Sequence, residues 1–522
     1  MVSSLAFMLA TTLAATTPCE GLKSVPLPDT TITAAELVPE GPAPQRGGGG
    51  AGVPARGAGP GAGRGAAPAA GRGAAPAQAA QPPARIPAHC RVTMVLKPTS
   101  DSNIHVELWL PAENWNGKFM GVGNGGWAGS IQGLTSEMPA ALRLGYATAG
   151  TDTGHSSVDG PEGMFALGHP EKIVDFAYRA VHETAVKSKL LVKAFYDENA
   201  RYSYFKGCST GGREAMMEAQ KYPEDYDAII AGSLANRHIH MHTAGVARSI
   251  EASRHPEANV SEAQAAMVTD AVMKACDTLH EGFLNNPRQC TFNFSSLLCK
   301  GADAGTCLTK PQVETVEKFY GGTKTKNGTK KGELIFSGQA LGNPMRASRG
   351  YTEPPTGGAF DTVRILGFQN EKYDWHTFDL DRDMKIIDQK VAFVDSVNPD
   401  LSRFKAHGGK LLLTHGWSDT TITPEGTVYY YESVLKKMGK DQGDWMRLFM
   451  APGMAHCGGG PGVNTFDSIG TIEKWREQGI APDQMIGSNA QTGLKRPICP
   501  YPQSAQYKGS GDLKDAANWV CK

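Results

Sequence analysis

The sequence predicts an α/β fold, with a mostly parallel sheet flanked by helices. Strand-like and helix-like segments alternate between residues 91 and 233, the pattern of parallel strands joined by helical connections. The short apolar run YDAIIAGS at 226–233 is typical of a strand buried on both faces. Two more apolar runs, KLLLTHG at 410–416 and MRLFMA at 446–451, each lead into a polar loop and extend the predicted sheet.

Local signals predict the individual elements. The runs RVTMVLKP and NIHVELWLP are rich in β-favouring residues, and the polar stretch TSDSN between them indicates a hairpin. Helices are predicted where apolar residues recur at helical spacing, and Pro223 ends one of these runs. In chain order we expect two hairpin strands at 91–98 and 103–111 and a strand with a glycine turn at 116–126. A helix at 170–199, a strand at 202–207, a helix at 213–222 and a strand at 226–233 follow, and a C-terminal helix is expected at 467–479.

The composition allows a large core and argues against two classes of partner. Of the 522 residues, 40% are hydrophobic, and 52 Lys and Arg balance 52 Asp and Glu. This balance favours neither nucleic acid nor an anionic membrane surface as a partner. Beyond the N-terminus no run reaches the ~18 apolar residues that a membrane span needs, so we expect a soluble mature protein.

The alternation of strands and helices is lost between about residue 236 and residue 395. A span of roughly 160 residues is too long for an ordinary loop, so we interpret it as an inserted subdomain. The predicted organisation begins with a signal peptide at 1–17 and an N-terminal segment at 18–85. The first part of the α/β domain follows at 86–235, then the inserted subdomain at 236–395 and the second part of the α/β domain at 396–522.

The N-terminus and the cysteines favour export. LAFMLATTLAA at 5–15 has the length and small residues of a signal peptide, although no Lys or Arg precedes it, and a disordered apolar tail is the alternative. The ten cysteines are even in number and show no CxxC spacing of a zinc or thioredoxin-like site. A disulfide framework in a secreted or periplasmic protein is therefore the favoured interpretation.

Residues 41–85 are nearly all Gly, Ala, Pro and Arg and contain the repeat GRGAAPAA, GRGAAPAQ. Such a segment has little to bury, so we predict that it is disordered. Its arginines could contact a polyanion, but a solvated linker or loop is favoured. Because Cys19 and Cys90 flank the segment, we interpret it as a loop between two anchored strands.

Three residues predict nucleophilic catalysis. The pentapeptide GCSTG at 207–211 fits G-x-S-x-G, and it lies between a predicted strand and a predicted helix, as a nucleophile turn requires. Asp419 and His456 each follow a predicted strand, in the chain order Ser, Asp, His of α/β-hydrolases. Alternatively, Asp419 caps a helix and His456 is a loop residue. We favour a triad in which His456 is the base for Ser209 and Asp419 orients it.

A cysteine stands directly before Ser209 and another directly after His456, and Asp419 lies in the motif HGWSDTTITP. These three motifs, in this order and with their cysteines in register, resemble the tannase and feruloyl esterase family, which includes mono(hydroxyethyl) terephthalate hydrolases. The resemblance runs from about residue 86 to the C-terminus. It implies an α/β-hydrolase fold, a lid formed by the inserted subdomain, and hydrolysis of a gallate, ferulate or terephthalate monoester.

The resemblance also implies disulfides. Cys208 and Cys457 would pair and clamp the nucleophile loop to the base loop. This is compatible with geometry, since residues next to a hydrogen-bonded Ser and His pair lie within the ~7 Å between Cα atoms that a disulfide needs. Sequence alone leaves the connectivity open. The family pattern suggests four further pairs: Cys19–Cys90, Cys276–Cys290, Cys299–Cys307 and Cys499–Cys521.

GVGNGGWAG at 121–129 contains G-x-G-x-x-G, but no helical pattern follows the glycines as a nucleotide site requires. We interpret this stretch as the turn that donates backbone N–H groups to an oxyanion, as the glycine loop of esterases does. Thr210 would supply one N–H, and Gly125 or Gly126 the other.

Two segments of the sequence contain candidate metal ligands. Relatives carry a calcium loop near the first lid cysteine, whereas this chain has CDTLHEGFLNNP, about three residues shorter, in which Asp277 and Glu281 remain as candidate ligands. The segment HIHMH at 238–242 could present three histidines to zinc if it were a strand. Packing within the lid, or lining of the pocket, is the preferred interpretation of HIHMH. No cofactor is required by the expected reaction.

The predicted function is hydrolysis of an aromatic carboxylic ester through an acyl-enzyme. One alternative is a serine hydrolase acting on other esters or on peptides, because the same triad would serve. The other is a binding protein with an inactive hydrolase fold, although all three triad residues are present. Four aromatic residues could form surfaces for a substrate ring, or simply belong to the core: Trp127, Tyr351, Phe360 and Trp375.

Overall fold

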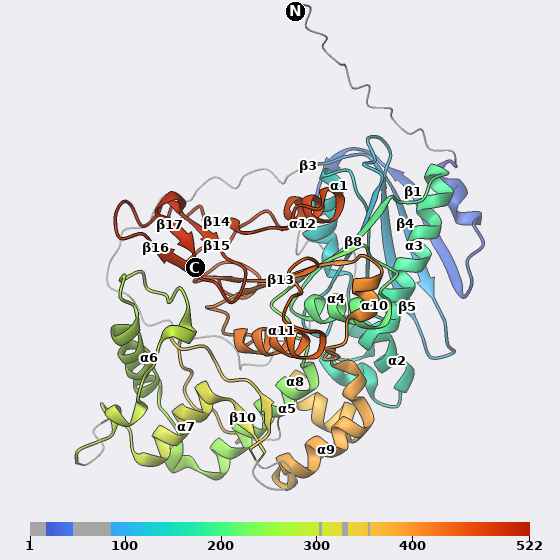
Figure 1. Cartoon of the computed structure of the whole chain (residues 1–522). Coiled ribbons are helices and arrows are strands. Elements are labelled where there is room, and N and C mark those ends of the chain that lie inside the picture. Colours follow the sequence, from blue (N-terminus) through green and yellow to red (C-terminus); the bar gives the residue numbers. More distant parts are fainter. Residues whose placement is uncertain (1–16, 45–84, 302–304, 326–331, 353–354, 356) are drawn as a thin grey trace, which may run out of the picture.

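The computed structural model describes residues 17–44, 85–301, 305–325, 332–352, 355 and 357–522 (Figure 1). The predicted signal peptide lies outside these residues except for its last position, and so does most of the low-complexity segment. No helix in the described ranges is long and apolar enough to cross a membrane.

A nine-stranded sheet forms the centre of the described part of the chain. Its strands are β1 Thr30–Val38, β4 His89–Leu96, β5 Ile104–Pro111, β6 Lys118–Val122, β7 Ala147–Thr151, β8 Tyr202–Cys208, β9 Ala228–Gly232, β12 Lys410–Gly416 and β13 Met446–Ala451. Their order is β1-β4-β5-β7-β6-β8-β9-β12-β13. Neighbours run parallel from β7 to β13 and antiparallel from β1 to β7, which confirms the predicted mostly parallel sheet.

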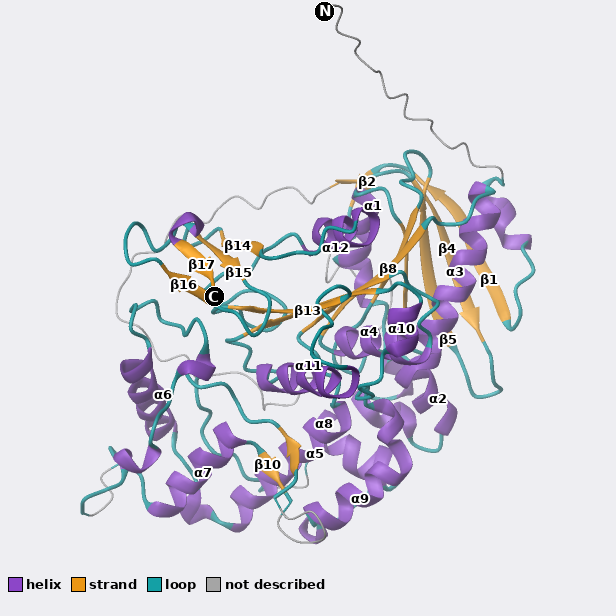
Figure 2. Ribbon diagram, in the orientation of Figure 1, coloured by secondary structure: helices purple, strands orange, loops and turns teal. Residues whose placement is uncertain are grey.

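Helices cover both faces of this sheet (Figures 1 and 2). The helices are α1 Glu137–Arg143, α2 Pro170–Val174, α3 Ala180–Tyr196, α4 Thr210–Lys221, α5 His238–Arg254, α6 Glu262–Cys276, α7 Lys310–Gly321, α8 Gly358–Asp361, α9 Leu380–Val391, α10 Ser402–Ala406, α11 Pro424–Met438 and α12 Ser468–Gln478. Residues of α3, α4 and α11 share one core with one face of the sheet, and residues of α1 and α12 share a second core with the other.

Strand periodicity builds these two cores. Along β12, Leu411 and Leu413 belong to the core with α3 and α11, whereas Leu412 belongs to the core with α12. Alternate side chains of a strand point to opposite faces, so a strand that is apolar at every position is stable only when both faces are covered. This explains why the short apolar runs form strands that are covered on both faces of the sheet.

The segment between β9 and β12 adds no strand to the main sheet within its described residues. It contains α5 to α10 and a small hairpin of β10 Thr323–Lys324 and β11 Leu334–Phe336. One of its apolar clusters is shared with residues 165–177 of the preceding part, and the other lies between α6 and α7. The four aromatic residues considered as ring surfaces all lie in or against the shared cluster: Trp127, Tyr351, Phe360 and Trp375.

The ends of the low-complexity segment are ordered, which corrects the prediction of disorder over the whole of 41–85. β2 Gly41–Pro42 pairs with β3 Arg85–Ile86 in a short antiparallel ladder, and Arg85 forms an ion pair with Glu40 at 2.7 Å. Residues 45–84 lie outside the described part. The neighbouring strands β1 and β4 are paired, so the expected anchoring strands on either side of the segment are present.

All ten cysteines lie in the described residues, and they form five disulfides. The pairs agree with those implied by the family pattern: Cys19–Cys90, Cys208–Cys457, Cys276–Cys290, Cys299–Cys307 and Cys499–Cys521. The last of these joins two C-terminal hairpins, β14 Met485–Asn489 with β15 Leu494–Ile498 and β16 Ala505–Tyr507 with β17 Trp519–Cys521.

Candidate active site

Ser209 stands at the sharp turn between β8 and α4. Its φ of 65° and ψ of −122° lie in a region that side-chain-bearing residues rarely adopt, as expected of a strained nucleophile turn. The flanking glycines make the turn possible, because a Cβ on Gly207 would lie 2.2 Å from the carbonyl oxygen of Gly211. The predicted G-x-S-x-G turn is therefore present, with the strand before it and the helix after it.

The glycine turn after β6 lies directly against this bend. The hydroxyl of Thr210 donates to the carbonyl of Gly126 at 2.7 Å, and the N–H of Gly211 donates to the carbonyl of Asn124 at 2.7 Å. Within the described chain, the backbone N–H groups of Thr210, Gly125 and Gly126 donate to no other residue. These N–H groups thus remain available beside Ser209.

Glu214 holds the glycine turn in this place, a role that no sequence pattern indicated. Its carboxylate accepts the backbone N–H of Asn124 at 2.9 Å, and the Asn124 amide donates to the carbonyl of Thr151 at 3.0 Å. Burial raises the pKa of Glu214, even though the neighbouring Arg213 acts in the opposite direction. The turn is therefore tied to both α4 and β7.

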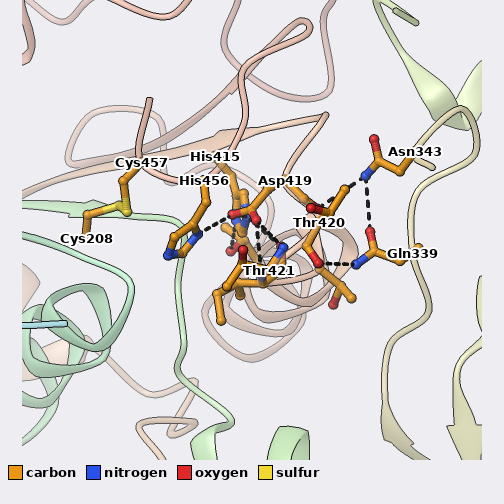
Figure 3. Close-up of polar contacts among 12 residues, drawn as sticks. Cys208, Gln339, Asn343, His415, Asp419, Thr420, Thr421, His456 and Cys457 are labelled. Carbon is orange, nitrogen blue, oxygen red and sulfur yellow. Dashed lines mark hydrogen bonds and ion pairs between the residues drawn. A yellow bond between two sulfur atoms is a disulfide. The ribbon is translucent and has the colours of Figure 1, made fainter. Parts of the chain in front are cut away.

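Asp419 and His456 meet at the ends of β12 and β13 (Figure 3). His456 Nδ1 lies 2.7 Å from Asp419 Oδ2. The other carboxylate oxygen accepts the backbone N–H groups of Thr421 and Ile422 at 2.8 and 3.0 Å. Both oxygens of the fully buried acid are thereby satisfied, and its direction toward His456 is fixed.

A second histidine, His415, contacts the same carboxylate, a role that no sequence pattern indicated. His415 Nε2 lies 3.1 Å from Asp419 Oδ2 and 3.2 Å from the carbonyl oxygen of Ile422, so this nitrogen carries the proton and donates it. Burial alone would raise the pKa of Asp419, but the hydrogen bonds of His415 and His456 outweigh burial and hold it well below its usual range. Asp419 therefore stays ionised.

The disulfide between Cys208 and Cys457 links the loop of Ser209 to the loop of His456. The two Cα atoms of this disulfide are 6.0 Å apart, although 249 residues separate them in the chain. Figure 3 shows the disulfide beside the imidazole of His456. Since Ser209 follows Cys208 directly and His456 directly precedes Cys457, the nucleophile and the base must lie on adjoining loops. The structure thus places His456 in contact with Asp419 and links the loop of Ser209 to that of His456 through the disulfide.

The predicted calcium ligands do not fit a calcium site. Both carboxylate oxygens of Glu281 pair with the buried guanidinium of Arg496, at 2.6 and 3.0 Å. The carboxylate of Asp277 accepts the backbone N–H groups of Glu281 and Gly282 in its own turn. A Ca²⁺ ion needs six to eight oxygen ligands, and a buried cation beside the site opposes it.

The histidines of HIHMH are helical, so the premise of a strand is wrong. They open α5, where His238 and His242 share a face and His240 points elsewhere. His240 Nδ1 lies 2.6 Å from an oxygen of Asp395. The rings of His238 and His242 pack against Trp127 at centre distances of 4.8 and 5.4 Å. Packing, the preferred interpretation, agrees with these contacts.

Burial of His242 predicts a loss of stability in acid. Burial lowers the pKa of His242 from 6.5 to about 4. Between these values the unfolded chain binds a proton that the folded chain does not, so the free energy of unfolding falls as the pH drops through this window. For this single group we expect a loss of about 2 kcal/mol between pH 7 and pH 5.

Urea unfolding at pH 7 and pH 5 measures this loss. His242→Asn should retain a hydrogen bond to Thr362, which lies 2.8 Å from His242 Nδ1, and should lose less stability between the two pH values than the unchanged protein. His407→Gln, at an exposed position, serves as the control. An equal pH dependence of the His242→Asn variant and the unchanged protein would contradict the assignment.

One other group of side chains in the described chain has the spacing of metal ligands, namely His182, Glu218 and Asp225. His182 and Asp225 already have partners. His182 Nδ1 lies 2.6 Å from Asp225 Oδ2, and Lys189 donates to the carbonyl of Asp225. Burial, followed by the charge of Asp225, raises the pKa of Glu218 well above its usual range. A protonated Glu218 beside an ion pair explains the group without a metal.

Comparison with known proteins decides the family. The sequence profile described as tannase and feruloyl esterase matches residues 90–522. The chain belongs to the tannase and feruloyl esterase family. An uncharacterized esterase of Xanthomonas campestris is 34% identical over 493 residues, covering 84% of each chain. A probable feruloyl esterase B-2 of Neosartorya fischeri is 32% identical over 466 residues, covering 83% of this chain and 86% of the relative.

Solved structures agree with this family. Feruloyl esterase B from Aspergillus oryzae superimposes with a TM-score of 0.80 and 29% identity, over 97% of this chain and 99% of the other. Tannin acyl hydrolase from Aspergillus niger has a TM-score of 0.71 at 18% identity, over 95% and 92%, and this match supports the fold alone. This member of the family is a carboxylic ester hydrolase with the α/β-hydrolase fold.

Proposed function

We propose that this esterase is exported from the cytosol and hydrolyses aromatic carboxylic esters through a Ser209–His456–Asp419 triad. One observation carries the proposal: the strained turn of Ser209 is linked by the Cys208–Cys457 disulfide to the histidine whose Nδ1 contacts the buried Asp419 at 2.7 Å. This is the arrangement in which an acid orients a base beside a nucleophile. The five disulfides support an oxidising compartment, outside the cell or in a periplasm.

In the proposed reaction His456 takes the proton of the Ser209 hydroxyl as its oxygen attacks the ester carbonyl carbon. Asp419, ionised at all relevant pH values, stabilises the imidazolium that forms. The negative oxygen is bound by the N–H of Thr210 and by the N–H of Gly125 or Gly126. His456 then protonates the leaving alcohol, and a water that it deprotonates releases the acid from the serine.

The aromatic substrate class rests on the relatives. Two of them are named feruloyl esterases, and the matching family profile is described as tannase and feruloyl esterase. We therefore propose an ester of a hydroxylated or carboxylated aromatic acid, such as a gallate, ferulate or terephthalate monoester, bound under the segment at 236–395. The proposed steps use only groups of this chain and water.

Hydrolysis assays test this proposal. Methyl gallate, methyl ferulate and mono(2-hydroxyethyl) terephthalate are compared with methyl hexanoate and with a peptide anilide, and release of acid or aniline is measured. We expect at least one aromatic ester to be cleaved with a kcat/KM about tenfold or more above that of the hexanoate, because an aromatic pocket discriminates by ring contacts. Preference for the hexanoate or the anilide would favour another serine hydrolase. Binding of an aromatic ester without release of acid would favour an inactive hydrolase fold.

A further inference from the structure

A short stretch of the segment at 236–395 lies against the loop that carries the triad acid. We call this stretch, residues 337–346, the brace. Asn343 donates its side-chain amide to the backbone carbonyl of Asp419 at 3.2 Å. Gln339 donates to the carbonyl of Thr420 at 3.3 Å, and Arg346 donates to the same carbonyl at 3.4 Å. Figure 3 shows Gln339 and Asn343 pointing toward this loop.

The chemistry of these contacts fixes their direction. A backbone carbonyl can only accept, so the side chains of Asn343 and Gln339 must present their N–H groups to the acid loop. Asn343 is buried, and its amide also donates to Gln339 Oε1 at 3.1 Å. The oxygen of Gln339 is thereby occupied, and its amide nitrogen is left facing Thr420. The two amides therefore stabilise each other in one orientation.

The brace is itself held on the side away from Asp419. The N–H of Gln339 donates to the carbonyl of Phe319, and the hydroxyl of Tyr320 donates to the carbonyl of Asn343, so α7 supports both amides. Ala340, between them, is buried in the core beneath the main sheet. The brace thus connects the segment at 236–395 rigidly to the acid loop.

The contacts on the opposite side of the acid loop leave two backbone carbonyls of this loop without a donor. The N–H of Ser418 donates to the carbonyl of Met454, which ties the start of the loop to the loop of His456. The carboxylate of Asp419 is held by His415 and by two N–H groups of its own turn. The carbonyls of Asp419 and Thr420 point away from these contacts, and in the described residues only the brace donates to them.

We propose that Asn343, supported by Gln339, is a positioning residue for Asp419, so that the segment at 236–395 completes the triad as well as covering it. The inference rests on the proposed triad. A lost amide would let the peptide after Asp419 rotate and shift its carboxylate relative to His456. Because misplacement by ~1 Å can cost about a hundredfold in rate, we expect Asn343→Ala to lower kcat about tenfold and to leave KM within about twofold.

A double-mutant cycle separates positioning from general damage. If Asn343 acts through Asp419, then Asn343→Ala should cost no more than about twofold when Asp419→Asn has already removed the acid. If Asn343→Ala does not fold, Gln339→Ala takes its place, because Gln339 is less buried; this variant should also lower kcat. Gln369→Ala is the matched control, since its amide also joins this segment to the rest of the protein, at Ala166, but contacts no triad residue.

The outcomes distinguish the inference from the proposed function. A wild-type enzyme that cleaves none of the esters overturns the function and, with it, this inference. An active wild-type enzyme with an equally active Asn343→Ala overturns the inference alone. It is likewise overturned if Asn343→Ala costs tenfold in the Asp419→Asn background, or if Gln369→Ala costs as much, because the effect would then not pass through the acid.

Discussion

Replacing Ser209 by alanine is expected to lower kcat on the best aromatic ester by about 10⁴-fold or more. The reason is that no acyl-enzyme can form without the hydroxyl, so only direct attack by water on the bound ester remains. The oxyanion donors and the binding site would still supply some residual acceleration. Acid release from purified protein, followed over hours at high enzyme concentration, measures this residual rate.

Two variants control for unrelated damage. Ser203→Ala changes a serine at the other end of the same strand, β8, and should retain the rate. Ser209→Ala combined with His456→Ala should be no slower than Ser209→Ala alone, because the two side chains act as one unit. If Ser209→Ala kept more than a hundredth of the activity, the nucleophile would have to be another residue.

Removing the disulfide next to the triad is expected to affect both rate and stability. In Cys208→Ala/Cys457→Ala the nucleophile and base loops are no longer linked, and a shift of ~1 Å between them would lower kcat about a hundredfold. The disulfide closes a loop of 249 residues, for which the chain-entropy model gives a stabilisation of about 5 kcal/mol. Steady-state kinetics and urea unfolding measure the two effects on the same preparation.

The disulfide between Cys499 and Cys521 provides the matched control. It closes a loop of 22 residues, so its removal should cost about 3 kcal/mol in the same model, and it contacts no triad residue. Cys499→Ala/Cys521→Ala should therefore lose stability and keep its kcat. Were the Cys208→Ala/Cys457→Ala variant to lose stability but keep its kcat within twofold, the disulfide would stabilise the fold without positioning the triad.

Local sequence patterns were enough to predict much of the fold. The strands around β8, β9, β12 and β13 were recognisable because strands buried on both faces are short and continuously apolar. β7 was not predicted because its sequence, ATAGT, consists of small residues that include polar Thr, and it therefore lacks a continuous apolar run. The segment HIHMH was considered as a strand because alternate histidines suggest a period of two, but α5 forms there since its packing against Trp127 and the shared cluster outweighs a weak local preference.

Local sequence signatures are enough to name the residues of the proposed triad, because a nucleophile turn has a recognisable pattern and the acid and base follow strands in a set chain order. The resemblance to the family, and not the spacing of the cysteines, implied which cysteines pair, and the structure contains those five pairs. Other contacts are visible only in the folded chain: His415 and Asn343 on Asp419, Glu214 on the glycine turn, and Arg496 on the candidate calcium ligand Glu281. These contacts join residues up to 215 positions apart in the chain. An amide or a carboxylate can bond to many different groups, so the residue type alone does not specify its partner in the fold.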